Sequence, residues 1–279
     1  MGKFQIKLLP NLTICLLITG MLLGSCKKKE SETVDNRTDG AGPVVGGDGS
    51  IPDAFGGDID LDNLPNYGNQ SKPAYILKDN SDTNAIDDAK ATIGRVFFYD
   101  KRLSIDNSIS CGSCHQQAFG FSDTARVSTG VNGTTARHSM RLINARFGAE
   151  RKFFWDERAT SLEDQTTHPI KDQVEMGFSE ATFNQLLSKL EKLGYYQELF
   201  YHVYGDIEIT EERMQECLAM FIRSIQSFDS KYDQGRAGVA NDQAPFPNFS
   251  EMEEEVVGSE ICFLDHLLLM VRDLELQAD

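Results

Sequence analysis

The chain has 279 residues, 40% hydrophobic and 25% charged, a composition typical of a globular protein with one large domain or two small ones. Its formal net charge of −16 argues against a nucleic-acid partner, because the phosphate backbone selects surfaces rich in Lys and Arg. An acidic protein of this kind can instead meet a basic partner through electrostatic steering.

The N-terminus predicts export from the cytoplasm. Residues 1–25 carry two early lysines and then an apolar run that is too short for a comfortable membrane span, as in a signal peptide. The run ends in Leu-Gly-Ser-Cys, which resembles a bacterial lipoprotein processing site and implies cleavage before Cys26 and lipid on its sulfur. Ordinary signal cleavage nearby is the alternative. Either way we expect the protein to leave the cytoplasm for the periplasm or cell envelope, and the lipoprotein interpretation adds a membrane contact through the lipid anchor alone.

Residues 26–70 are rich in Gly, Asp, Asn and Ser and show no periodic apolar pattern. Such a segment cannot bury a core, so it predicts a flexible, disordered tether between the anchor and a folded domain.

The remainder predicts a mainly α-helical scaffold with long functional loops. Apolar residues spaced by three and four predict helices over 86–97, 179–193 and 210–228, the second beginning at a capping Ser179. The third helix carries Cys217 on its apolar stripe, where it is expected to be a core residue. Residues 116–176 contain several glycines and are expected to be rich in loops.

The stretch "SCGSCH" places Cys111, Cys114 and His115 together. C-x-x-C-H is typical of c-type haem attachment: two thiols add to the vinyl groups, and the histidine ligates the iron. A thioredoxin-like redox pair would need a βαβ context, and a structural zinc site would need a second ligand pair; neither is visible. Export also favours haem.

The sixth iron ligand separates two classes of haem protein. Electron carriers fill it with Met or His, whereas peroxidases leave it open or able to open. Met176, 61 residues after His115, is a candidate, as are His138 and His168. Spacing alone does not choose among them.

A series of short motifs resembles the bacterial di-haem cytochrome c peroxidase family, which includes the MauG-type enzymes. They are "IGRVFFYDKRLS" from residue 93, the C-x-x-C-H, "FGFSD" from 119, "LINA" from 142, "FWDER" from 154, "LEDQ" from 162, and "EM" at 175. The resemblance spans roughly residues 75–250. It implies a cytochrome-c-like fold whose haem reacts with peroxide, with electrons from a small cytochrome c or copper protein.

The resemblance also implies roles for individual residues. Glu175 falls on the family's pocket glutamate, which shuttles a proton between the two peroxide oxygens. Gln165 and Pro169 fall on other pocket-lining positions. Trp155, the single tryptophan, matches the residue that lies between the two haems and carries electrons.

The resemblance also indicates which residues could be ligands of the haem iron or of calcium. It makes Met176 the neighbour of the catalytic glutamate and not an iron ligand, and it gives His168 no role. Residues 116–137 contain no histidine, so the haem is expected to be five-coordinate. His138 replaces an Asn that helps to bind calcium in relatives, which puts a calcium site in doubt.

The C-terminal part departs from the family. We expect residues 71–250 to be the peroxide-reactive haem domain and 251–279 to be a truncated or aberrant start of the second cytochrome domain. Cys262 and His266 lack a second cysteine, so one covalent haem site is visible where the family has two. The competing hypothesis is a monohaem c-type cytochrome that only carries electrons.

Overall fold

A computed structural model describes residues 49–81, 84–148, 152–241 and 244–258. The signal peptide, Cys26, Cys262 and His266 lie outside these residues. The described residues all belong to one compact unit. Within the described residues, no helix has the length and apolar character needed to cross a membrane.

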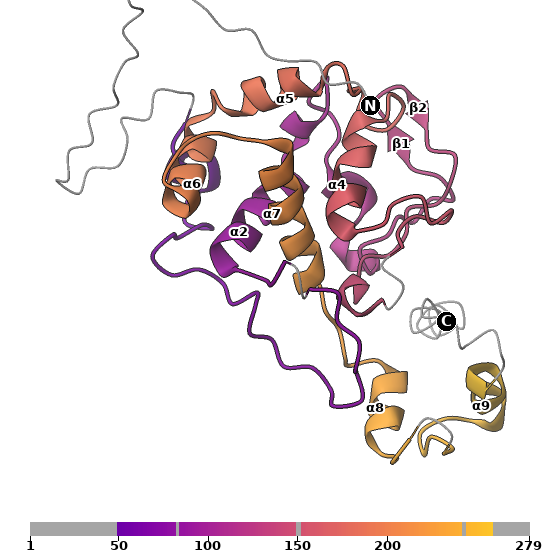
Figure 1. Ribbon diagram of the computed structural model, residues 1–279. Coiled ribbons are helices and arrows are strands. Elements are labelled where there is room, and N and C mark those ends of the chain that lie inside the picture. Colours follow the sequence, from indigo (N-terminus) through magenta and orange to yellow (C-terminus); the bar gives the residue numbers. More distant parts are fainter. Residues whose placement is uncertain (1–48, 82–83, 149–151, 242–243, 259–279) are drawn as a thin grey trace, which may run out of the picture. The chain divides into compact units, whose positions relative to one another are not determined.

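The described part is mainly helical, as expected (Figure 1). Its α-helices are α1 (Ile51–Phe55), α2 (Asp88–Tyr99), α3 (Cys111–Cys114), α4 (Leu162–Lys171), α5 (Phe183–Leu190), α6 (Gly194–Tyr204), α7 (Glu211–Ser224), α8 (Lys231–Ala237) and α9 (Glu251–Gly258). The short strands β1 (Thr129–Gly130) and β2 (Gly133–Thr134) pair antiparallel, with Thr129 opposite Thr134.

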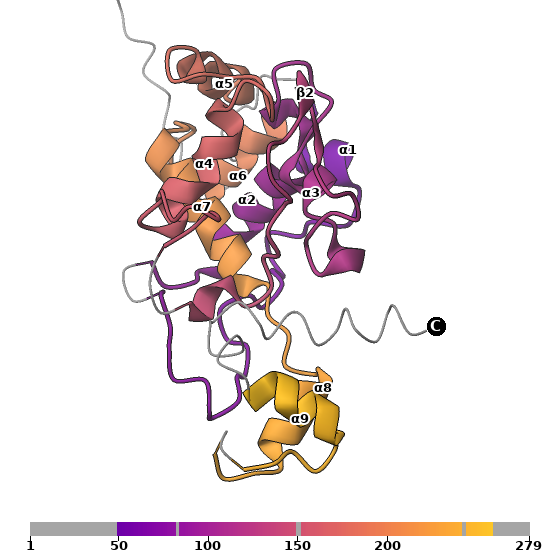
Figure 2. The ribbon, with the colours of Figure 1, turned by 90° about the vertical axis from the view of Figure 1, so that its right-hand side faces the viewer.

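The core is built around α2 and α7, which lie side by side in both views (Figures 1 and 2). They approach closely because α2 has no side chain at Gly94. A Cβ there would lie 2.0 Å from the carbonyl oxygen of Cys217 on α7. Cys217 is fully buried, which confirms its prediction as a core residue, and burial raises the pKa of its thiol to about 12. Glycine therefore sets the distance between the two central helices.

Most of the described part of residues 116–176 is loop, as expected, but helix α4 lies within this region and was not predicted. The Ser161 hydroxyl accepts a hydrogen bond from the amide of Asp164, and two acids occupy the first turn, both favourable at a helix N-terminus. Lys171 closes the last turn. Pro169 lies inside the helix and has no amide to donate to the carbonyl oxygen of Gln165, and the helix ends two residues later.

The helix expected over 179–193 is also shorter than predicted. Ser179 does not cap it: its amide donates to the Thr182 hydroxyl in a turn that precedes α5. After α5 the chain turns into α6, which the sequence reading did not separate. Helix α6 buries Tyr195 and Tyr196, whose hydroxyls both bond Asp100 at 2.6 and 3.0 Å.

The described end of the expected tether, residues 49–70, is packed on the domain and is not free. Ile51 is 4% exposed, and its amide donates to Glu198 on α6 at 3.1 Å. The Phe55 ring meets the Tyr195 ring edge-on at 5.2 Å. A few apolar residues in a polar segment are enough to dock it, because each finds a site in an existing core.

Two charged pairs stabilise the packing. Arg223 on α7 has its side chain only 3% exposed, and its guanidinium pairs with Glu163 of α4. Nearer the surface, Arg146 forms a bidentate pair with Asp79, with its closest contact at 2.7 Å. A buried arginine of this kind needs its partner, since an unpaired buried charge is costly.

Candidate functional site: a haem pocket

Cys111 and Cys114 of the C-x-x-C-H motif are the first and last residues of the one-turn helix α3, and His115 follows as its C-cap residue. Cys111 and Cys114 are half-buried free thiols, three residues apart, so they lie on the same side of one helical turn. The helix packs against α2 through Gly112, where a Cβ would lie 2.6 Å from the Tyr99 ring. Two thiols presented together from a rigid turn can form two bonds to one flat ligand.

The imidazole of His115 is fixed by backbone groups. Its Nδ1 lies 3.0 Å from the carbonyl oxygen of Phe121, and its ring lies 6.5 Å from that of Phe98. Burial lowers the pKa of His115, opposed by hydrogen bonding to the backbone of Phe121 and Met140. A neutral imidazole that donates from Nδ1 keeps the Nε2 lone pair for a metal.

These residues fit haem better than a bare metal ion. Among the described residues, no group of three or more His, Cys, Asp or Glu side chains is arranged to chelate a metal directly. Burial raises the pKa of the Cys111 thiol to about 12, and it also raises the pKa of Cys114. Two thiols and one histidine are fewer than the four ligands of a structural zinc site, so the set suits thioether attachment of a porphyrin better.

Glu175 lies on the segment between α4 and α5, and its backbone is held on two sides. Its amide donates to Asp172 Oδ1 at 3.0 Å, and its carbonyl accepts from the amide of Val131 at 3.0 Å. Gly130 allows this approach, because a Cβ there would lie 2.1 Å from the carbonyl oxygen of Val174. The turn between β1 and β2 thus sets the position of Glu175.

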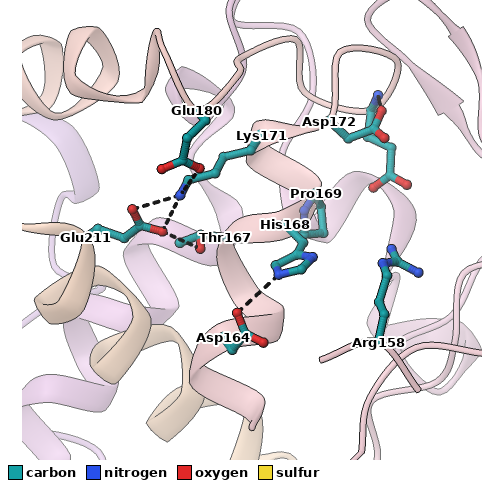
Figure 3. Close-up of a pocket in the computed structure, with 10 residues that line it drawn as sticks. Arg158, Asp164, Thr167, His168, Pro169, Lys171, Asp172, Glu180 and Glu211 are labelled. Atoms are coloured by element: carbon teal, nitrogen blue, oxygen red, sulfur yellow. Dashed lines mark hydrogen bonds and ion pairs between the residues drawn. The ribbon is translucent and has the colours of Figure 1, made fainter. Parts of the chain in front are cut away.

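The Glu175 side chain is half-buried and lines a pocket of about 490 Å³, in the usual size range for small-molecule sites. Figure 3 shows the neighbouring pocket residues Arg158 and Asp172. Burial and the charge of Asp172 raise the pKa of Glu175, while Arg158 opposes the rise. The negative charge of Glu175 in turn raises the pKa of both Cys111 and Cys114. The carboxylate therefore lies within electrostatic range of both thiols.

The structure brings together some of the predicted site residues and not others. Pro169, which Figure 3 labels, lines the pocket, and Glu175 lines the same pocket. Gln165 is half-buried on α4, but it does not line that pocket. Trp155 is 56% exposed and lines a separate hollow, and its indole N–H donates to the carbonyl oxygen of His138 at 2.9 Å. The lone tryptophan is thus a surface residue and not part of the core.

The other candidate iron ligands are engaged elsewhere. His138 bonds the Ser122 hydroxyl through Nε2 and the carbonyl oxygen of Ala125 through Nδ1, both at 2.9 Å. Met176 is 2% exposed and belongs to the hydrophobic core. His168 Nε2 lies 3.2 Å from Asp164 Oδ1, one turn earlier on α4, and both residues line the pocket (Figure 3).

Two pocket residues were missed by the sequence reading. Arg158 lies over the ring of Phe154 at 3.5 Å and donates to Asp156 at 2.8 Å, so its charge is held beside Glu175. Lys171 pairs with Glu180 and Glu211, both of which line the pocket (Figure 3). The pattern "FWDER" indicated the first only as part of a family motif, and nothing in the sequence distinguished the second.

Comparisons with known proteins point to one family. Residues 88–241 match the family of di-haem cytochrome c peroxidases. The methylamine utilization protein MauG of Methylophilus methylotrophus is 33% identical over 150 residues, covering 53% of this chain and 43% of that protein. The cytochrome c peroxidase Ccp of Escherichia coli K12 is 29% identical over 181 residues, covering 64% of this chain and 37% of that protein.

A solved structure shares the fold as well. The crystal structure of a MauG-like protein associated with microbial copper homeostasis superposes with a TM-score of 0.56 at 26% identity, covering 69% of this chain and 55% of that one. The match over 88–241 places the chain in the di-haem cytochrome c peroxidase family. The chain spans less than half the length of the curated relatives it matches.

Proposed function

We propose that the chain is a haem c peroxidase that reduces hydrogen peroxide to water with electrons from a small redox protein, of the cytochrome c or copper type. The observation that carries this proposal is the placement of Glu175. Its half-buried carboxylate lines a pocket and lies within electrostatic range of both thiols of the haem-attachment motif.

Each residue has a defined part in this chemistry. The sulfurs of Cys111 and Cys114 would form thioether bonds to haem, and His115 Nε2 would ligate its iron. When bound, haem supplies an iron site that takes up and passes on electrons. Glu175 accepts the proton from one peroxide oxygen and returns it to the other, which becomes the leaving water. With two electrons and two protons, one peroxide yields two waters.

The electron path and the location extend the proposal. Trp155 presents an exposed ring, which supports a role in passing electrons at the surface. Cys26 would carry the lipid that holds the protein at a membrane of the cell envelope. Mass spectrometry of the mature chain tests the anchor, since an N-terminus at Cys26 with added acyl mass is expected.

The electron-carrier alternative requires Met176 as the second axial ligand. Met176 is packed in the core, whereas the adjacent Glu175 lines the pocket. Because Met176 faces the core and Glu175 faces the pocket, this arrangement favours a carboxylic acid at the open face of the haem over a thioether ligand to its iron.

The test is the Glu175→Gln variant of the haem-loaded chain, mixed with hydrogen peroxide in a stopped-flow spectrometer. We expect the second-order rate constant to fall at least 100-fold, in line with loss of a general acid–base group. Glu208→Gln, which changes an exposed acid outside the pocket, is the matched control. An unchanged rate constant in Glu175→Gln would show that the proton shuttle is assigned wrongly.

A further inference from the structure

The segment that carries Glu175 has no regular secondary structure of its own. It runs from the end of α4 at Lys171 to the start of α5 at Phe183. A catalytic acid on such a segment needs external restraints, because displacement by about 1 Å can cost a rate factor of about 100. The turn at Gly130 supplies one restraint from one side.

Lys171 supplies a second restraint from the other side. Its ammonium lies 2.7 Å from Glu180 Oε2 and 2.7 Å from Glu211 Oε1 (Figure 3). It also lies 4.7 Å from the centre of the Phe183 ring. The two ends of the Glu175 segment are therefore joined to each other and to the first residue of α7.

Of the two ion pairs that Lys171 forms, the one with Glu211 is the stronger. Glu211 has its side chain 26% exposed and is itself held by the Thr167 hydroxyl at 2.8 Å, whereas Glu180 is 83% exposed. Exposed ion pairs contribute little, while partly buried and networked pairs contribute more. Helix α7 is a central core element. The two ion pairs of Lys171, which we call the Lys171 clamp, therefore connect the Glu175 segment to a rigid part of the domain.

We propose that Lys171 is a positioning residue for Glu175: by bridging Glu180 and Glu211, it holds the segment that carries the proton-transferring carboxylate. The inference rests on the proposed function. Lys171 acts through geometry, since Arg158 and Asp172, and not Lys171, are the charges that shift the pKa of Glu175.

The first experiment measures the segment directly, by amide hydrogen exchange of the haem-loaded chain. In this segment, the amides of Met176 and Gly177 donate to the carbonyl oxygen of Asp172 at 3.1 and 2.8 Å, which protects them from exchange. In Lys171→Met we expect these amides to exchange at least 10-fold faster, and Lys171→Arg should restore slow exchange. Lys231→Met, which breaks a comparable ion pair on α8, is the control. Unchanged exchange in Lys171→Met would overturn the proposal.

The second experiment measures the rate with peroxide. Lys171→Met should slow the reaction about 10-fold in the wild-type background and have no further effect in a Glu175→Gln background. Losses that multiply in the double variant would show that Lys171 acts independently of Glu175. Glu180→Gln removes only the exposed ion pair and keeps the fold. It should slow the reaction with peroxide less than Lys171→Met does. Because the exchange measurement does not depend on Glu175 chemistry, it tests the clamp even if the proton shuttle is assigned wrongly.

Discussion

Gly130 is the point at which a single methyl group should disturb the site. The Cβ of an alanine there would lie 2.1 Å from the carbonyl oxygen of Val174 and 2.9 Å from the Cα of Glu175. Real Cβ atoms do not approach closer than 3.0 Å, so the Val174 peptide must move by about 0.9 Å. Overpacking of this size costs about 1–3 kcal/mol of stability. The same displacement, passed to the carboxylate, should slow the reaction with peroxide about 100-fold.

The assay for Gly130→Ala combines thermal unfolding with the stopped-flow peroxide rate of the haem-loaded chain. Gly57→Ala is the matched control, because a Cβ at position 57 would meet no atom within 4 Å. We expect the melting temperature of Gly130→Ala to fall by several degrees and its rate to fall much further than that of the control. A rate within twofold of wild type would refute the reasoning that the β1–β2 turn sets the position of Glu175.

Three further predictions concern stability. Gly94→Ala should destabilise the domain by about 3 kcal/mol by urea unfolding, because its methyl group would push α2 away from α7; equal stability would contradict the close-approach argument. Arg223→Met leaves Glu163 without its buried partner and should cost about 3 kcal/mol by the same assay, whereas a neutral result would show that the pair is dispensable. Burial raises the pKa of Asp79, but hydrogen bonds from Arg146 and Ser81 outweigh this effect and lower the pKa to about 2, from 3.8. The free energy of unfolding should therefore be highest above pH 4 and should fall as the pH is lowered towards 2. In Asp79→Asn, urea unfolding should show a smaller fall over this pH range.

The central helices could be predicted from the sequence because their apolar residues repeat at three and four. The expected 210–228 became α7, Glu211–Ser224, with the Thr210 hydroxyl accepting from the amide of Arg213 at the N-terminus. Helix α4 was missed because a proline interrupts its pattern and the surrounding residues are polar. Its capping serine and acidic first turn were the signals that could have revealed it.

The C-x-x-C-H motif could be recognised from the sequence because the chemistry of haem attachment fixes the identity and spacing of its residues. The position of Glu175 was not, since it depends on contacts between segments far apart in the chain: the β1–β2 turn and the clamp formed by Lys171. The docking of residues 49–70 was missed for a similar reason. Composition shows that a segment cannot form its own core, but it does not show whether an existing core accepts a few of its side chains.

The central claim is that the haem held by Cys111, Cys114 and His115 has a reactive side open to peroxide and served by Glu175. The most direct test is the optical spectrum of the ferric haem-loaded chain before and after hydrogen peroxide is added. The account predicts a high-spin spectrum that changes at once with peroxide. A low-spin spectrum that peroxide leaves unchanged would contradict it and would favour a carrier with a second axial ligand from the protein.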